Sequence, residues 1–407
     1  MLRCGLLGEK LGHSYSPAIH ALLGDYEYKL YEIPRDDLAD FIQNGAWDGL
    51  NVTIPYKKAV VPFCTALSST ARALGSVNTL VRRPDGSIYG DNTDFFGFSQ
   101  MVRASGIRAE GEKAVVLGSG GASVTVCAVL RELGAREITV ISRHGEDNYT
   151  NLDRHRDAAL VVNTTPVGMY PHNGESPVSL DAFPQCRGVL DIIYNPARTA
   201  LLLQAEERGI PCASGLRMLV AQAKASAQQF TGTPIPDDRI EPILKKMERT
   251  LRNIILVGMP GCGKSTVAAA LARELGMEVV EADALIAQQA GMTIPEIFAA
   301  EGEAGFRARE TAVLAQQGKR SGIILSTGGG CVTRAENYSL LHQNGRIFWL
   351  IRGLDKLAKE GRPLSLSTPA EALWQQREAL YARFADARVD NDGRLDDTLR
   401  HIKELIS

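Results

Sequence analysis

Short apolar runs alternate along the chain with amphipathic segments in which apolar side chains return every three or four residues. The short runs predict β-strands and the amphipathic segments predict helices. Such alternation is typical of α/β folds, in which crossover helices connect parallel strands, so we expect parallel sheets. In the first part of the chain the predicted strands are residues 3–8, 28–33, 49–54, 113–118, 137–142, 160–165 and 189–194, and the predicted helices are residues 16–23, 123–133, 199–207 and 217–230.

The same alternation begins again at residues 253–258 and continues with apolar runs at 277–282, 322–327 and 346–351. No Gly/Ser-rich or Pro-rich tract separates the two series. Instead, a predicted helix runs almost directly into strand 253–258, and we place a domain boundary near Thr250. The length of 407 residues also favours two or three domains.

The composition indicates a globular protein without specialised segments. Hydrophobic residues make up 44% and charged residues 23%, and the net charge of −2 gives no basic footprint for nucleic acid. The longest apolar runs are far too short to span a membrane, and the N-terminus has no cleavable signal pattern. Seven scattered cysteines without a C-x-x-C pair favour a reducing cytoplasm, and the histidine spacing predicts no structural metal.

The segment "GMPGCGKST" fits the phosphate-binding pattern G-x-x-x-x-G-K-[ST]. It lies between strand 253–258 and a predicted helix 265–275 that ends at Gly276. Backbone N–H groups of such a loop and the following helix N-terminus cradle phosphates, the lysine reaches the β/γ-phosphates and the serine ligates Mg²⁺. The variable loop position holds a cysteine that we interpret as a filler residue. The expected nucleotide-binding residues are Gly258, Gly261, Cys262, Gly263, Lys264, Ser265 and Thr266, with Ser265 at the metal.

Polar residues and glycines after this loop narrow the range of possible substrates. Asp283 lies near the C-terminal end of the second strand, where ligands bind in open α/β sheets. Gly328, Gly329 and Gly330 follow a strand and allow close backbone approach to a ligand. Three arginines, each of which alone is typical of a surface, complete the set: Arg307, Arg362 and Arg377.

Together these motifs resemble shikimate kinase over residues 252–407, and the resemblance implies ATP and Mg²⁺ as cofactors. It implies that Asp283 binds the substrate hydroxyls and accepts the proton of the attacking hydroxyl, and that Gly329 contacts the substrate. Arg307 and Arg377 would bind the carboxylate, and Arg362 would close over the phosphates. Two departures are visible: Glu281 replaces an aspartate near Mg²⁺, and the lid segment is short and leaves the adenine-contacting arginine unassigned.

Residues 113–143 form half of a predicted dinucleotide-binding unit. Its glycine pattern is imperfect, with Ser123 at the third position. Arginine at the end of the second strand suits a 2′-phosphate, which favours NADP over NAD, although a solvated strand end would have the same sequence. The residues expected to bind the cofactor are Gly118, Ser119, Gly120, Gly121, Ala122 and Arg143.

Candidate chemistry precedes this unit, although each residue also has an ordinary structural interpretation. Ser14 or Ser16 could cap the helix that Pro17 starts, Lys57 could be an exposed lysine, and Asp94 could cap the next helix. The order of the motifs is more specific: S-x-S-P, N-V-T-x-P-x-K, V-N-T, G-D-N-T-D and G-x-x-M-L-V-x-Q-A are all present.

These motifs resemble shikimate dehydrogenase across residues 1–250. The resemblance implies that Lys57 and Asp94 form the acid/base pair, and that a lysine held by a carboxylate protonates the ketone oxygen as hydride adds to carbon. It implies that residues 163–169 and Met218 flank the nicotinamide, while Asp147 stands where the family often has a second basic residue. It also implies that Ser14 and Ser16 contact the substrate carboxylate, that Thr53, Asn78, Tyr194 and Gln222 line the pocket, and that Gly215 lies at the cofactor.

The combination predicts a bifunctional enzyme of the shikimate pathway. NADPH would reduce 3-dehydroshikimate to shikimate, and ATP would then phosphorylate shikimate to shikimate 3-phosphate. The expected domains are residues 1–100 plus 216–250 for the substrate, 101–215 for NADP in a Rossmann-like fold, and 252–407 for the P-loop kinase. We expect small-molecule substrates, no nucleic acid, no membrane and a cytoplasmic location, with a homodimer as a candidate assembly.

Three alternatives remain open at this point. The dehydrogenase could act on quinate, one half could be a nucleotide-sensing module that regulates the other, or the kinase could act on another small hydroxylated metabolite.

Overall fold

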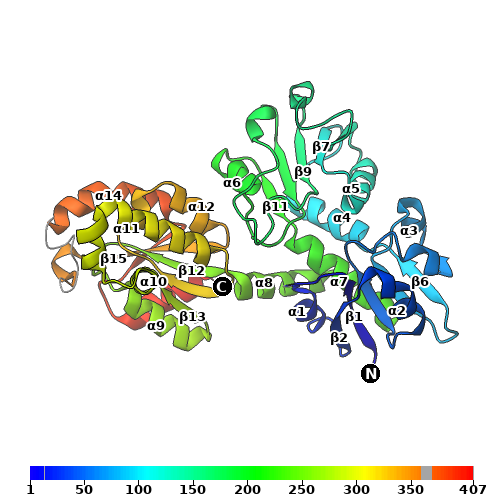
Figure 1. Cartoon of the computed structure of the whole chain (residues 1–407), viewed down its shortest axis with the longest axis horizontal. Coiled ribbons are helices and arrows are strands. Elements are labelled where there is room, and N and C mark those ends of the chain that lie inside the picture. Colours follow the sequence, from blue (N-terminus) through cyan, green and yellow to red (C-terminus); the bar gives the residue numbers. More distant parts are fainter. Residues whose placement is uncertain (13, 359–368, 407) are drawn as a thin grey trace. The chain divides into compact units, whose positions relative to one another are not determined.

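A computed structural model gives the fold for residues 1–12, 14–358 and 369–406. The chain divides into two compact units, the first comprising Met1–Met169 with Glu175–Met247 and the second Tyr170–Gly174 with Glu248–Ser407. Figure 1 shows the elements in chain order from blue to red. Arg362, expected at the kinase lid, lies outside the described residues.

The first sheet of the N-terminal unit has the strand order β2-β1-β3-β5-β6-β4. Strand β1 pairs in parallel with β2 and β3, whereas β5 pairs antiparallel with both β3 and β6. The strands are β1 (Arg3–Gly8), β2 (Glu27–Glu32), β3 (Gly49–Val52), β4 (Ala66–Leu67), β5 (Thr79–Arg82) and β6 (Ile88–Asp91). The helices around them are α1 (Ser16–His20), α2 (Leu38–Asn44), α3 (Ser69–Leu74), α4 (Asp94–Ser105) and α7 (Leu216–Thr231).

The antiparallel pairs correct the expectation of parallel strands throughout. Strands β5 and β6 form a hairpin, closed where the Arg83 N–H donates to the Ser87 carbonyl at 2.8 Å. The turn contains Pro84-Asp85-Gly86, and Gly86 has a φ of 79° that favours glycine. A Pro-Asp-Gly sequence is a turn signal in its own right, so the hairpin could have been found from the sequence.

The second sheet, also in the N-terminal unit, is parallel and has the order β11-β10-β9-β7-β8. Successive residues of β7 face opposite sides, so Val116 packs with α4 and α5 while Val115 packs with α6. Both faces are therefore buried, as in doubly covered parallel sheets. The elements are β7 (Lys113–Leu117), α5 (Gly121–Glu132), β8 (Glu137–Ile141), β9 (Leu160–Asn163), β10 (Gly188–Asp191), α6 (Ala200–Glu207) and β11 (Cys212–Ser214).

Helices α4 and α7 pack closely inside the N-terminal unit. A Cβ at Gly97 would lie 2.7 Å from the Met218 carbonyl oxygen, so glycine allows the approach. After α7, helix α8 (Ile240–Leu251) ends one residue before the next strand. The prediction of a helix that runs almost directly into a strand near Thr250 is thus confirmed.

The C-terminal unit is built on a parallel sheet with the order β13-β14-β12-β15-β16. The long helix α11 is kinked at Gly302, which has a φ of 69°. Among the described residues, we find no helix that combines the length and apolar character needed to cross a bilayer. The elements are β12 (Asn253–Val257), α9 (Lys264–Leu275), β13 (Glu278–Glu281), α10 (Ala282–Ala290), α11 (Ile294–Gly318), β14 (Ile323–Ser326), α12 (Glu336–His342), β15 (Gly345–Ile351), α14 (Ala370–Phe384), β16 (Ala387–Asp390) and α15 (Leu395–Ile406).

Candidate functional site

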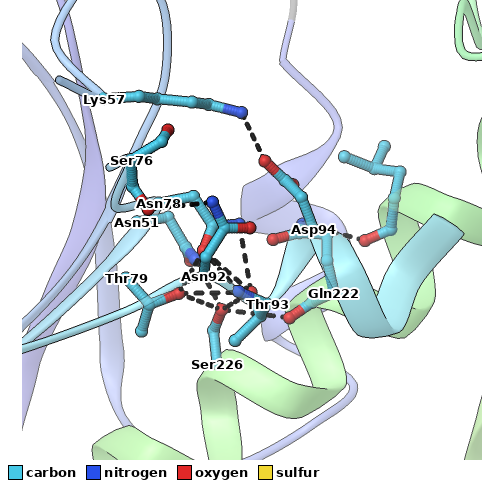
Figure 2. Close-up of polar contacts among 11 residues, drawn as sticks. Asn51, Lys57, Ser76, Asn78, Thr79, Asn92, Thr93, Asp94, Gln222 and Ser226 are labelled. Carbon is cyan, nitrogen blue, oxygen red and sulfur yellow. Dashed lines mark hydrogen bonds and ion pairs between the residues drawn. The ribbon is translucent and has the colours of Figure 1, made fainter. Parts of the chain in front are cut away.

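Lys57 and Asp94 form an ion pair in the N-terminal unit, with Lys57 Nζ 2.5 Å from Asp94 Oδ2 (Figure 2). Lys57 lies beyond β3, and Asp94 is the first residue of α4. Their side chains are only 20% and 10% exposed, so Lys57 is not an ordinary surface lysine. The N-cap of α4 is Thr93, so the alternative in which Asp94 caps this helix is wrong.

Asn78 holds the start of α4 in place. Its Oδ1 accepts the Thr93 backbone N–H at 2.7 Å, and its Nδ2 donates to Thr93 Oγ1 at 3.1 Å. Gln222, on α7, is buried and donates from Nε2 to the Leu219 carbonyl at 2.9 Å. Figure 2 shows both amides beside the Lys57–Asp94 pair, so two of the predicted pocket residues lie near the acid/base candidates.

The loop before α1 brings further predicted residues together. The Ser16 N–H donates to Ser14 Oγ at 3.2 Å, and the Tyr15 ring lies 5.3 Å from the Tyr194 ring, centroid to centroid. Tyr15 is the N-cap of α1, so neither serine caps the helix, contrary to the structural alternative. Thr53 follows β3 and donates its N–H to the Leu7 carbonyl at 2.9 Å.

A buried polar network beneath these residues was missed by the sequence analysis. Its members belong to β3, β5, the start of α4 and α7, and they contact one another through side chains (Figure 2). Three of them lie inside the matched motifs, and the fourth lies one helical turn after Gln222, a spacing that places it on the same helix face. The network comprises Asn51, Thr79, Thr93 and Ser226.

The glycine turn after β7 fits a pyrophosphate. Gly118 has a φ of 102°, and a Cβ there would lie 2.9 Å from Thr165 Cγ2. A Cβ at Gly120 or Gly121 would meet nothing within 4 Å, and the N-cap of the 12-residue helix α5 makes no side-chain hydrogen bond. A helix N-terminus with open space above it is suited to bind phosphate.

The residues expected to select NADP lie beyond β8. Arg143 and His144 are both exposed. Asp147, which stands where a basic residue was expected, contacts the buried His155 instead, with Oδ1 2.9 Å from Nε2. Its carboxylate is thus engaged within the unit. The role of Arg143 at a 2′-phosphate stays a prediction.

Close packing also explains why Gly215 is a glycine, in addition to its predicted role at the cofactor. It is the N-cap of α7, and a Cβ there would overlap the Ile192 carbonyl. Ile192 belongs to the segment that leads from β10 to Tyr194, so this glycine lets α7 begin against that segment.

Asp191, at the end of β10, is a fully buried carboxylate that the sequence analysis did not single out. It accepts from Asn163 Nδ2 at 3.1 Å, Thr199 Oγ1 at 2.7 Å and the Ile193 N–H at 3.0 Å. Burial raises the pKa of Asp191 to about 7, although these three donors act to lower it. The carboxylate joins the predicted nicotinamide loop, the start of α6 and the segment that carries Tyr194.

The phosphate loop of the C-terminal unit has the expected backbone. Gly258, Gly261 and Gly263 have φ values of 148°, 85° and 97°, which favour glycine. Lys264 begins α9, is buried, and donates from Nζ to the carbonyls of Gly258 at 2.9 Å and Met259 at 3.1 Å. The loop therefore holds an ammonium group and a helix N-terminus together, which fits bound phosphates.

Ser265 Oγ donates to Glu281 Oε2 at 3.0 Å, so the longer carboxylate still reaches the predicted Mg²⁺ ligand. Asp283 lies in the first turn of α10, and a Cβ at Gly328 would be 2.9 Å from its Oδ1. In the described ranges, no group of three or more His, Cys, Asp or Glu side chains could hold a metal. Ser265 is the residue of this loop that would hold Mg²⁺, and this ion usually keeps several waters and binds substrate phosphates.

Arg307 is buried on α11 and pairs with two carboxylates, Glu310 Oε2 at 2.7 Å and Glu303 Oε1 at 3.2 Å. A Cβ at Gly330 would overlap its guanidinium group. Burial raises the pKa of Glu310, and the neighbouring Arg307 opposes that shift. Glu310 was not predicted, although its i+3 spacing from Arg307 on a helix was a signal.

Arg377, on α14, donates from Nη1 to the Gly329 carbonyl at 3.2 Å. The Tyr381 hydroxyl donates to the same oxygen, and this residue was also missed, although it lies one turn after Arg377. The predicted substrate residues of the kinase half, apart from Arg362, therefore gather around the glycine triplet after β14.

Comparisons with known proteins agree with both halves. The family model described as shikimate dehydrogenase substrate binding domain matches residues 6–80, and the shikimate kinase model matches residues 260–407. A shikimate dehydrogenase (NADP(+)) of Clostridium perfringens is 33% identical over 265 residues, which cover 60% of this chain and 97% of that protein.

Two solved structures extend the comparison. A chorismate mutase/shikimate 5-dehydrogenase fusion protein from Clostridium acetobutylicum is 36% identical with a TM-score of 0.58, covering 61% of this chain and 97% of that one. Quinate dehydrogenase from Corynebacterium glutamicum in complex with NAD is 27% identical with a TM-score of 0.54, covering 60% and 99%. The N-terminal unit thus has the fold of these dehydrogenases.

Proposed function

We infer the function of this chain from two facts: it belongs to the shikimate dehydrogenase family, and it carries a shikimate kinase domain over residues 260–407. We propose that it reduces 3-dehydroshikimate to shikimate with NADPH and then phosphorylates shikimate with ATP. The product of the N-terminal half is the substrate of the C-terminal half, so the two activities are consecutive steps. The observation that carries the proposal is a polar site in each unit, with the Lys57–Asp94 pair in one and Lys264 with the residues around the glycine triplet in the other.

Lys57 is the proposed acid of the reduction. NADPH, when bound, supplies the hydride to the carbonyl carbon. The Lys57 ammonium gives its proton to the ketone oxygen, which becomes the hydroxyl, and the lysine recovers a proton from solvent. Asp94, 2.5 Å away, holds Lys57 in position. Ser14 and Ser16 bind the substrate carboxylate, while Thr53, Asn78, Tyr194 and Gln222 line the pocket.

The glycine turn after β7 is the proposed cofactor site. Its backbone N–H groups, from Gly118 to Ala122, and the open N-terminus of α5 bind the pyrophosphate. The exposed guanidinium of Arg143 pairs with the 2′-phosphate, which selects NADP over NAD.

Asp283 is the proposed acceptor of the proton in the phosphoryl transfer. It takes the proton of the shikimate 3-hydroxyl while that oxygen forms a bond to the γ-phosphorus of ATP and the bond to the leaving ADP breaks. Lys264 and the loop N–H groups neutralise the phosphate charge, and Ser265 ligates Mg²⁺. Arg307 and Arg377 hold the substrate carboxylate, for which the planar guanidinium is well shaped. Arg362 is assigned to the phosphates from its motif alone.

We further propose a cytoplasmic enzyme that acts on small molecules. The free, mostly buried cysteines fit a reducing compartment. A homodimer is part of the proposal, and sedimentation of the whole chain tests it.

A second candidate substrate for the first half is quinate, because the dehydrogenase fold is shared with a quinate dehydrogenase. Turnover of shikimate and of quinate with NADP⁺ distinguishes the two substrates. Turnover of shikimate with NAD⁺ tests the preference for the cofactor. We expect shikimate with NADP⁺ to have the highest kcat/KM. A kinase for another hydroxylated metabolite would phosphorylate an analogue without the carboxylate as well as shikimate.

The first test uses the whole purified chain. It is supplied with 3-dehydroshikimate and NADPH, then with Mg·ATP, and the products are identified by mass spectrometry. Shikimate in the first stage and shikimate 3-phosphate in the second support the proposal. A missing product in one stage would contradict the assignment of that half and would favour a nucleotide-sensing role for it.

A further inference from the structure

Ser226 lies at the centre of the buried polar network in Figure 2. It is fully buried on α7, and its Oγ has partners on three other elements. Asn51 Nδ2 of β3 donates to it at 2.7 Å. Thr79 Oγ1 of β5 lies at 2.8 Å, and Thr93 Oγ1 at the start of α4 lies at 2.9 Å.

The hydrogen-bonding capacity of Ser226 is fully used. A serine hydroxyl has one proton to donate and two lone pairs that accept. The Gln222 carbonyl, 3.0 Å away, can only accept, so it takes the Ser226 proton. The lone pairs then accept from Asn51 and from a threonine hydroxyl. No other side-chain group in Figure 2 is bonded to as many separate elements.

One arm of this network ends at the acid/base pair. Thr93 is the N-cap of α4, and its N–H is held by Asn78 Oδ1 at 2.7 Å. Asp94 is the next residue along the chain, and its carboxylate meets Lys57. A change in the side chain or backbone of Thr93 therefore moves Asp94.

The other arm ends at the proposed carboxylate-binding loop. Asn51 Oδ1 accepts from the Tyr28 hydroxyl at 2.8 Å. Burial raises the pKa of the Tyr28 hydroxyl well above its usual value, and the Ser16 side chain acts to lower it, so Ser16 is a neighbour of that hydroxyl. Asn51 is thus fixed on one side by Tyr28 and on the other by Ser226.

We propose that Ser226 is a positioning residue of the dehydrogenase: its hydroxyl fixes Thr93 and Asn51 and so sets the distance between the Lys57–Asp94 pair and the Ser16 end of the pocket. This role rests on the proposed function of the N-terminal half. Ser226 would not touch the substrate itself, because its hydroxyl is fully buried and its hydrogen bonds go to the Gln222 carbonyl, Asn51 and a threonine.

Removal of this hydroxyl changes geometry because buried donors seek new partners. Without Ser226 Oγ, the Asn51 amide loses its acceptor. The Thr93 hydroxyl can turn to Asn78 Oδ1, which lies 3.2 Å away and already accepts the Thr93 N–H. The start of α4 then loses the restraint that α7 supplies, and Asp94 is held less firmly against Lys57.

The test compares Ser226→Ala with Ser99→Ala in the whole chain. Ser99 is a matched control, because it is also a buried serine of the same unit, and its Oγ has no hydrogen-bond partner within the described part of the chain. For Ser226→Ala we expect a kcat/KM for 3-dehydroshikimate about tenfold lower. The KM for 3-dehydroshikimate should rise as kcat falls, because the Lys57–Asp94 pair and the Ser16 end of the pocket are no longer held at a fixed distance. Ser99→Ala should match the wild type.

Three readouts separate positioning from a loss of folded protein. NADPH affinity, measured by fluorescence titration, and kinase activity should both stay at the wild-type value in Ser226→Ala. Ser226→Cys keeps the shape and a weak donor and acceptor, so its kcat/KM should fall between serine and alanine, and it serves as the test if the alanine variant does not fold.

Two outcomes would overturn the proposal. One is a folded Ser226→Ala chain with unchanged kcat/KM. The other is a kcat that falls only in proportion to the folded fraction, with KM unchanged, which would make the hydroxyl purely structural. If the wild-type chain itself does not reduce 3-dehydroshikimate, it is the proposed function that fails.

Discussion

A lysine that is mostly buried and held by a carboxylate is unusual, because burial of an ammonium group is costly without a partner. Lys57 meets this condition with Asp94, whereas its neighbour Lys58 is exposed. We expect Lys57→Ala to lower kcat for 3-dehydroshikimate by about 10²- to 10⁴-fold, the range for loss of a general acid. Lys58→Ala, assayed in parallel, should be unaffected, and the kinase activity of both variants should persist. A fully active Lys57→Ala chain would remove the acid role.

The buried carboxylate of Asp191 predicts a pH dependence of stability. Burial raises its pKa from 3.8 to about 7, so the folded unit binds the proton more tightly than the unfolded chain. The resulting stabilisation is fully present below pH 3.8 and is lost as the pH rises through about 7. At about 1.4 kcal/mol for each pH unit, this amounts to about 4 kcal/mol.

The test of this prediction compares the wild type with Asp191→Asn, whose side chain cannot titrate. Between pH 4 and 7 the free energy of unfolding of the wild type should fall relative to that of the variant. Trp47 is the single tryptophan of the N-terminal unit. Urea unfolding followed by its fluorescence, with Trp349 and Trp374 replaced by phenylalanine in both chains, reports on that unit. A difference that is constant over this pH range would mean that Asp191 stays ionised in the folded state.

The sequence could predict those residues that stand at fixed positions of a known motif. Lys57, Asp94 and Lys264 stand at fixed places in recognisable patterns, and in the structure Lys57 meets Asp94 while Lys264 begins α9. Ser226 and Tyr381 are different, because their importance lies in which buried partners their helices meet. A helix of known periodicity still does not tell which strand or carbonyl its face will contact, so such partners appear only in the folded structure.

At the scale of elements, the glycine triplet after β14 allows α11 to lie close to the end of that strand. A Cβ on Gly330 would overlap the guanidinium of Arg307, which is a flexible side-chain end that can move aside. We therefore expect Gly330→Ala to displace Arg307 while the unit stays folded. The KM for shikimate should rise about tenfold in the kinase assay, because a charged hydrogen bond contributes about 1.5–3 kcal/mol, and the KM for ATP should change little. Equal effects on both KM values would indicate general distortion, and the dehydrogenase activity of the same chain is the control.

The sequence predicted elements best where the hydrophobic pattern is continuous. Strands β7, β9, β10 and β12 are buried on both faces, so each is apolar apart from a polar residue at one end. Strands β5 and β6 were missed because each has only four residues and polar residues stand at their ends, such as Asn78 before β5 and Asp91 at the end of β6. Their antiparallel pairing comes from a five-residue connection, which is too short for a crossover helix.

At the scale of the whole molecule, the C-terminal unit has a core around its one sheet, the N-terminal unit has cores around its two sheets, and each proposed site lies within one unit. We therefore expect NADPH and Mg·ATP to stabilise different parts of the chain. A ligand at 100 times its Kd stabilises the unit that binds it by about 2.7 kcal/mol. In thermal unfolding, NADPH should delay loss of dehydrogenase activity alone and Mg·ATP loss of kinase activity alone. Lys264→Ala should abolish the effect of Mg·ATP and keep that of NADPH. Protection of both activities by either nucleotide would mean that the two units unfold together, and that a ligand in one is sensed by the other.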